Sequence, residues 1–165
     1  SSIRDPDPVI FMEPKKMYRA IKEEVPEEEY VIPIGQAKVV RKGTDFSIFS
    51  YGAMLHTALA AADQIKDKYQ AEVVDLRTLS PLDTDAIVES VKKTGRAIVV
   101  HEAPKSCGVG AEIVALINEN ALLSLEAPVI RVTGFDTIVP LPKLENYYFP
   151  NVERVVRAVE RVMSY

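Results

Sequence analysis

From residue 44 onward, short apolar runs alternate with longer stretches in which apolar residues recur every three or four positions. The short runs are typical of strands, and the longer stretches are typical of helices. The pattern predicts strands at 45–51, 71–76, 97–102 and 129–133, and helices at 54–68, 83–94, 109–124 and 151–164. Strands that alternate with helices imply right-handed crossovers. We therefore expect an α/β fold with a doubly wound, mainly parallel sheet and helices on both faces.

Two of the predicted helices have further support. Asp83 stands where the helix 83–94 should have its N-cap, and Gly95 stands where that helix should end. The last helix places a stripe of valines opposite a face of arginines and glutamates. The stripe lasts only about two heptads, which is too short for a coiled coil. This helix is expected to pack against the body of the domain.

The first 43 residues follow a different pattern. An apolar strand is predicted at 9–12, after two Asp-Pro steps, whereas 15–43 is rich in charge and has no sustained helical period. We interpret residues 1–15 as the remnant of a preceding domain, 16–43 as a linker, and 44–165 as the main domain. The glutamates of the linker, Glu23, Glu24 and Glu27 to Glu29, are more typical of a solvated surface than of a cation site.

Composition excludes several classes of function. The chain has 165 residues, 47% of them hydrophobic, which is enough for one well-buried core. Its net charge of −4 comes without clusters of lysine or arginine, so nucleic acid is not an expected partner. No apolar run approaches the roughly 18 residues that span a bilayer, and the start does not resemble a secretory signal. We expect a soluble protein of the cytoplasm, or of the mitochondrial matrix if the source is eukaryotic.

His101 and Glu102 come at the carboxyl end of a predicted central strand, where open α/β sheets bind ligands. A general acid or base would be well placed there. A histidine that only fixes the following loop by hydrogen bonds is the stronger interpretation. Ser106 lacks the Gly-x-Ser-x-Gly setting of a hydrolase nucleophile, and no partner residues stand at triad spacing.

The predicted helix after this strand begins with Cys107, Gly108 and Gly110. A thiol at a helix N-terminus can be reactive, but a small residue filling a tight turn explains Cys107 equally well. The two glycines form half of a phosphate-binding fingerprint, and Glu112 would repel a pyrophosphate there. We expect the glycines to permit a turn with positive φ and close packing of helix on sheet. His56 shares no metal-ligand spacing with His101 and is interpreted as structural.

Glu126 lies at the end of the predicted helix 109–124, directly before Ala127-Pro128. A carboxylate in this position could pair with a cationic residue of a partner, which would add specificity and association rate. A solvated glutamate at a helix end is the equally weighted alternative.

Several stretches, in this order, resemble the β subunit of thiamine-dependent 2-oxo acid dehydrogenases. They are 8–15 (PVIFMEPK), 23–26 (EEVP), 73–79 (VVDLRTL), 91–96 (VKKTGR), 101–104 (HEAP), 125–128 (LEAP) and 131–134 (RVTG). The resemblance covers nearly the whole chain but only the carboxyl half of such a subunit. The Glu-Pro-Lys, His-Glu-Ala-Pro and Leu-Glu-Ala-Pro segments look closer to the branched-chain (2-oxoisovalerate) members than to the pyruvate members.

The resemblance implies a carboxyl-terminal domain like that of transketolase, in an oxidoreductase that decarboxylates a 2-oxo acid and transfers the acyl group to a lipoyl arm. Thiamine diphosphate and magnesium would belong to the full complex, bound by parts of the family's subunits that have no counterpart here. No catalytic, cofactor or metal residue is carried over, and this chain alone is expected to be inactive.

The resemblance also implies which partners this chain assembles with. It implies an α2β2 heterotetramer with an α subunit and a second β subunit, and docking of the subunit-binding domain of the dihydrolipoyl acyltransferase core. The docking residues would be Glu126 and the terminal carboxylate of Tyr165. Two alternatives stay open: a stand-alone interaction module, and the corresponding domain of a transketolase or deoxyxylulose phosphate synthase, for which Lys105 and Arg131 are the few basic candidates.

Overall fold

A computed structural model describes residues 1–165 and shows a five-stranded sheet in the order β1-β3-β2-β4-β5. The strands are β1 (Lys38–Arg41), β2 (Phe46–Ser50), β3 (Ala71–Asp75), β4 (Ala97–Pro104) and β5 (Ile130–Gly134). β2, β3, β4 and β5 are parallel, and β1 pairs antiparallel with β3 at one edge. The predicted mainly parallel, doubly wound sheet is confirmed.

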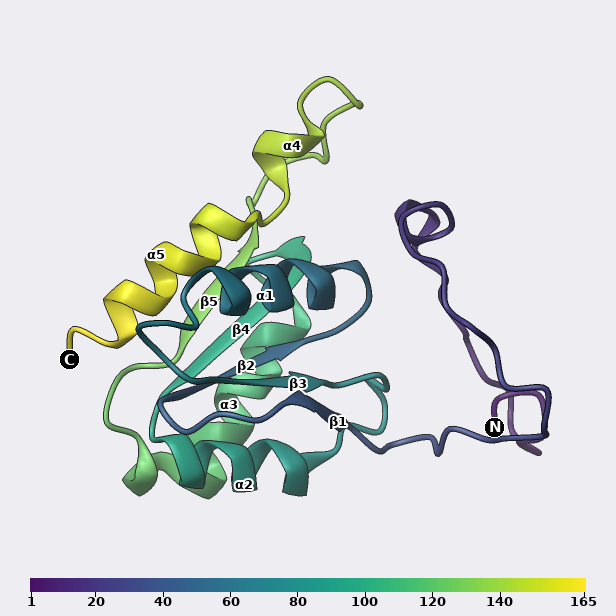
Figure 1. The fold of residues 1–165 in the computed structure, drawn as a ribbon, viewed down its shortest axis with the longest axis horizontal. Helices are drawn as coiled ribbons and strands as arrows, with labels where there is room; N and C mark the ends of the chain where they lie inside the picture. The colour runs from purple at the N-terminus through teal and green to yellow at the C-terminus, as the bar shows by residue number, and fades with distance from the viewer.

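Helices cover both faces of this sheet (Figure 1). The α-helices are α1 (Ala53–Gln64), α2 (Thr84–Thr94), α3 (Val109–Ala121), α4 (Glu145–Tyr148) and α5 (Val152–Val162), with short 3-10 turns η1 (Lys15–Met17) and η2 (Leu122–Ser124). α1 and α5 pack on one face, and α2 and α3 pack on the other. None of the helices has the length and apolar character that a membrane span requires.

The alternation of side chains along β4 explains the two cores. Ile98 and Val100 point into the cluster shared with α1 and α5, whereas Val99 points into the cluster shared with α2 and α3. All three side chains are fully buried. Because successive residues of a strand face opposite sides, a continuous apolar run is what a strand covered on both faces requires.

The ends of α2 lie where the sequence predicted them. The Asp83 carboxylate accepts the backbone N–H of Ala86 at 3.1 Å, as an N-cap does, and Gly95 ends the helix with φ of +68°. α5 begins in the same way, because the Asn151 side chain accepts the N–H of Arg154 at 2.9 Å. Its valines Val155, Val159 and Val162 are buried against the sheet, so the predicted packing of the last helix is confirmed.

Two predictions for the amino-terminal part differ from the structure. The apolar run at 9–12 forms no strand, and its side chains are exposed, because no other segment of the chain pairs with it. Conversely, β1 lies in the segment predicted as linker. Four residues with two charges give little strand signal, and antiparallel pairing with β3 supplies what the local pattern lacks.

The segment before β1 forms an arm that leaves the body of the molecule (Figure 1). Its two halves run beside each other, since the Ser1 hydroxyl bonds to the backbone of Ile32 and Arg4 pairs with Glu29. The arm meets the body again near η1, where Met17 packs against the core shared with α1 and α5.

Candidate functional site

The sheet offers one position for a ligand crevice, at the carboxyl ends of β2 and β4. The chain leaves β2 toward β3 on one side and leaves β4 toward β5 on the other, so the two connections diverge between these strands. This is the topological switch point at which open α/β sheets bind ligands. His101 and Glu102 lie in the last part of β4, at this point, as the sequence predicted.

The imidazole of His101 is fully buried and serves as an acceptor for helix α3. Its Nε2 accepts the backbone N–H of Gly110 at 3.2 Å, and its ring stacks on Tyr51 with centroids 6.2 Å apart. Nδ1 is buried without a hydrogen-bond partner. Burial lowers the pKa of His101, and the charge of Arg131 lowers it further. A neutral ring that satisfies a free N–H at a helix start favours the structural interpretation of His101.

The glycines at the start of α3 allow the helix to approach this ring. A Cβ on Gly110 would lie 2.4 Å from His101 Nε2, and a Cβ on Gly108 would lie 2.5 Å from the carbonyl oxygen of Pro104. Close packing is therefore the reason for both glycines. The expected positive φ falls instead on Cys107, at +58°, while Gly108 has φ of −81°. The Cys107 side chain is exposed and unpaired.

Glu102 is the accessible member of the pair. It is half-buried, and burial raises the pKa of its carboxyl, with Lys16 of the arm opposing the shift and Glu145 adding to it. The pKa of Tyr51 is also raised, by burial and then by the negative charge of Glu102. Burial therefore favours the neutral forms of His101, Glu102 and Tyr51. His56 lies exposed on α1 and does not join them.

The loop after β4 is fastened by residues that sequence reasoning did not single out. The carboxylate of Asp136 accepts the N–H and the hydroxyl of Ser106, both at 2.8 Å, and these bonds lower the pKa of Asp136. Arg131 donates to the carbonyl oxygen of Lys105 at 2.8 Å. Ser106 is thus an anchor of this loop. No group of three or more His, Cys, Asp or Glu side chains is arranged to hold a metal ion.

A second site surrounds Glu126 at the opposite end of the sheet, where the parallel strands begin. The N–H of Glu126 donates to the carbonyl oxygen of Gly95 at 2.7 Å, and its carboxylate pairs with the guanidinium of Arg96. The Glu126 side chain remains 60% exposed. Arg96 precedes β4 and His101 lies five residues further on, so the two sites are separated by about 16 Å along the strand.

Glu126 lines two grooves. One has a volume of about 380 Å³ and is lined mostly by polar groups: Thr44, Asp45, Lys92, Lys93, Thr94, Gly95, Arg96, Ser124, Glu126 and Met163. The other, of about 490 Å³, is lined mainly by apolar groups: Val114, Asn118, Leu122, Leu125, Glu126, Ala127, Pro128 and Val129. The carboxylate therefore stands at the boundary between a charged surface and an apolar one.

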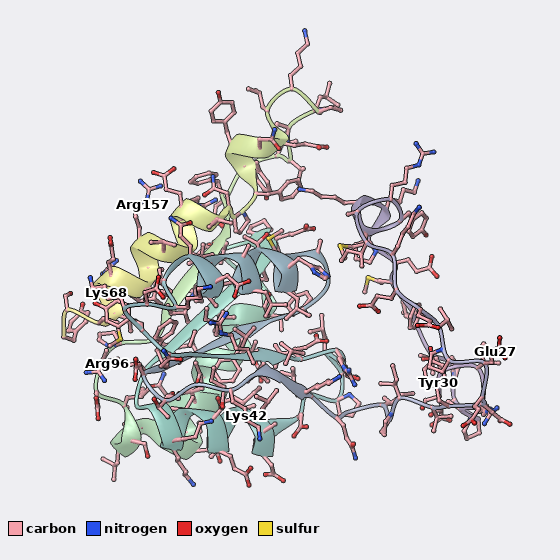
Figure 2. The ribbon with its side chains drawn as sticks, in the orientation of Figure 1. Glu27, Tyr30, Lys42, Lys68, Arg96 and Arg157 are labelled. Atoms are coloured by element: carbon pink, nitrogen blue, oxygen red, sulfur yellow. The ribbon has the colours of Figure 1, made fainter.

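The end of α5 reaches the same edge as Glu126. Met163 lines the polar groove, and Tyr165, two residues further on, is 61% exposed. Figure 2 shows Arg96 on the side of the molecule where the carboxyl terminus lies in Figure 1. No hydrogen bond or ion pair joins Glu126 to Tyr165, the two predicted docking residues. Sequence reasoning did not identify Arg96 as the partner of Glu126, because the two are far apart along the chain.

Comparison with known proteins identifies the domain. The family of transketolase C-terminal domains matches residues 35–155. The match begins before β1 and ends within α5, so it covers the whole sheet. It also takes in the strand that the sequence pattern assigned to the linker.

Curated relatives match the full length of the chain. The pyruvate dehydrogenase E1 component subunit beta of Bacillus subtilis is 55% identical over 166 aligned positions, and that of Staphylococcus aureus is 50% identical. The chain spans about half, 51%, of the length of each of these proteins. Both are pyruvate dehydrogenase subunits, so they give no support to the resemblance to branched-chain members.

Solved structures agree on the fold. The chain superposes on a split-gene transketolase, described as an inactive beta4 tetramer, with a TM-score of 0.73 and 27% identity, over 86% of this chain and 46% of that one. It also superposes on a 2-oxoglutarate:ferredoxin oxidoreductase from Magnetococcus marinus with a TM-score of 0.53 and 12% identity, over 78% of this chain and 19% of that one. The second likeness concerns the fold alone.

Proposed function

This chain belongs to the family of transketolase C-terminal domains, and on that premise we propose that it is the carboxyl-terminal region of the β subunit of a 2-oxo acid dehydrogenase. The observation that carries the proposal is the 55% identity to a pyruvate dehydrogenase E1 β subunit along the whole chain. The whole protein would be an oxidoreductase that decarboxylates a 2-oxo acid with thiamine diphosphate and passes the acyl group to a lipoyl arm. Pyruvate is the favoured substrate, because the relatives bear that name, and 2-oxoisovalerate is the alternative.

The residues of this chain do not fit thiamine diphosphate or its magnesium ion. At the start of α3, which follows β4, the N–H of Gly110 is already bonded to His101. Glu112 adds a negative charge in the first turn of that helix, where a diphosphate would need positive potential. We propose that the cofactor is held by other parts of the assembly and that this chain alone is inactive. The exposed, unpaired Cys107 is in keeping with a cytoplasmic location.

We propose assembly and docking as the tasks of this region. The partners are an α subunit and a second β subunit in an α2β2 tetramer, together with the subunit-binding domain of the dihydrolipoyl acyltransferase core. Glu126 supports the docking part of the proposal, since it is an exposed acid at the boundary of two grooves. Tyr165, which is exposed two residues beyond the Met163 that lines the polar groove, is the second proposed docking residue.

Calorimetric titration of this chain with the subunit-binding domain tests the proposal. Replacement Glu126→Ala should weaken binding about tenfold, since charged pairs in interfaces contribute on the order of 1–2 kcal/mol, and removal of Tyr165 should also weaken it. Glu153→Ala is the matched control, because Glu153 is an exposed acid in the first turn of α5, at the other end of that helix. No binding by the unaltered chain would leave subunit assembly as its only proposed task.

A transketolase-like enzyme is a second candidate, favoured by the superposition on the split-gene transketolase. Such an enzyme would be expected to hold phosphorylated sugars with basic loop residues. Of the two candidates, Arg131 is already bonded to the backbone of Lys105, which leaves Lys105 as the freer cation. Activity of the full assembly on pyruvate, on 2-oxoisovalerate and on sugar phosphates distinguishes the three substrates.

A further inference from the structure

Two neighbours hold the side chain of Glu126 in one place. Beneath it lies Gly95: a Cβ there would come within 2.9 Å of Cγ and of Cδ of Glu126. The glutamate therefore lies across the bare backbone of the α2–β4 turn. Beside it lies Arg96, whose guanidinium donates to Oε2. Oε1 accepts no hydrogen bond from the chain.

Arg96 is itself fixed by its surroundings. Its carbonyl oxygen accepts the N–H of Ser47 at 2.8 Å and the hydroxyl of Thr94 at 3.2 Å, so its backbone is tied to the start of the sheet. Its side chain is only 21% exposed, and Nε is buried. The arginine therefore forms a rigid support for a carboxylate that would otherwise move freely at an exposed helix end.

We propose that Arg96 is a positioning residue for docking: it holds Glu126 by Oε2 and leaves Oε1 to a cationic side chain of the partner. The inference rests on the proposed docking function and adds the residue that organises the docking acid. A carboxylate fixed before binding loses less side-chain entropy when the complex forms. The polar groove is also lined by Asp45, Lys92 and Lys93, so a cationic partner meets both signs of charge there, and the position of Glu126 decides which contacts it makes.

A double-mutant cycle tests this role, with titration of the chain by the subunit-binding domain as the measurement. Arg96→Met keeps the length of the side chain and removes the donor, and it should weaken binding by about three- to tenfold. Arg96→Lys retains one donor and should restore affinity to within about twofold of the unaltered chain. In a Glu126→Ala background, Arg96→Met should have no further effect. Lys92→Met is the matched control: Lys92 lines the groove without an ion pair to Glu126, so removing its charge should not weaken binding.

Three outcomes would overturn the proposal. Tighter binding by Arg96→Met would make the arginine a competitor of the partner. A loss that persists in the Glu126→Ala background would show that Arg96 acts on the partner or the fold directly.

The third outcome comes from a measurement that does not depend on docking. Side-chain couplings of Glu126 measured by NMR should show one rotamer in the unaltered chain and averaging over several rotamers in Arg96→Met. Equal averaging in both chains would refute positioning, whereas failure of the chain to bind the domain would refute only the docking function.

Discussion

Two properties of His101 are typical of a structural histidine rather than a catalytic one. Its side chain is fully buried, and its Nε2 accepts the backbone N–H of Gly110. The strand–loop–helix pattern predicted where the residue lies, at the carboxyl end of a central strand. It could not predict the acceptor role, because that depends on how closely α3 approaches β4. The two glycines were the available signal, since only a residue without Cβ fits beside the ring.

The stability of the domain should depend on the protonation of His101. Its pKa is lowered in the folded chain, so on acidification the unfolded chain, with an ordinary pKa of 6.5, binds the proton first. The stabilisation is therefore fully present above about pH 6.5 and declines as the pH falls toward the folded pKa. We expect the free energy of unfolding to fall by up to ~1.4 kcal/mol per pH unit through this group.

Urea denaturation between pH 5 and 8, as a rough working range around the histidine pKa, measures this effect. His101→Gln retains an acceptor for the N–H of Gly110 and should remove much of the slope below pH 6.5. His56→Gln is the control, because it removes the other histidine of the chain, which lies exposed on α1. An identical pH profile for His101→Gln and the unaltered chain would exclude His101 as the source.

At the scale of the elements, α2 begins at a residue that also holds the edge of the sheet. One oxygen of Asp83 caps the helix through the N–H of Ala86, and the other accepts the N–H of Ala37 at 2.8 Å, directly before β1. The cap was predictable, since an aspartate before an amphipathic run is a local signal. The bond to Ala37 was not, because it depends on a chain segment 46 residues away. For the same reason, β1 was assigned to the linker.

Asp83→Asn therefore separates two functions of one side chain. Asparagine can still cap α2 with its oxygen, but its NH2 group cannot accept the N–H of Ala37. We expect a loss of about 1–2 kcal/mol in the free energy of unfolding, with faster amide exchange in β1 and little change in α2. Asp85→Asn, in the first turn of the same helix, is the control. Faster exchange in α2 rather than in β1 would show that capping is the main role of Asp83. The measurement is hydrogen exchange resolved by NMR.

At the scale of the whole molecule, the structure suggests where the independently folding unit begins. Among the residues before Gly35, Met17 is partly buried and packs against the core of the body. From Gly35 onward the backbone is tied to the domain, since its N–H donates to the hydroxyl of Thr78 at 3.0 Å and Ala37 bonds to Asp83. The sequence pattern placed the start of the domain at residue 44, after β1. We propose a start near Gly35, in keeping with these bonds and with the family match at 35–155.

Two truncations decide between these boundaries. Removal of residues 1–34 should leave the sheet intact and lower the free energy of unfolding by no more than about 1–2 kcal/mol, the contribution of one partly buried side chain. Removal of residues 1–42 takes away β1, frees the edge of β3 and leaves the second oxygen of Asp83 without its partner. That loss should be larger, about 3 kcal/mol or more, because it adds unpaired strand groups to lost packing. Chemical denaturation of both truncated chains measures the difference. Equal stability of the two truncated chains would place the boundary after β1. If the chain that lacks only residues 1–34 is unfolded, the arm is part of the folded unit.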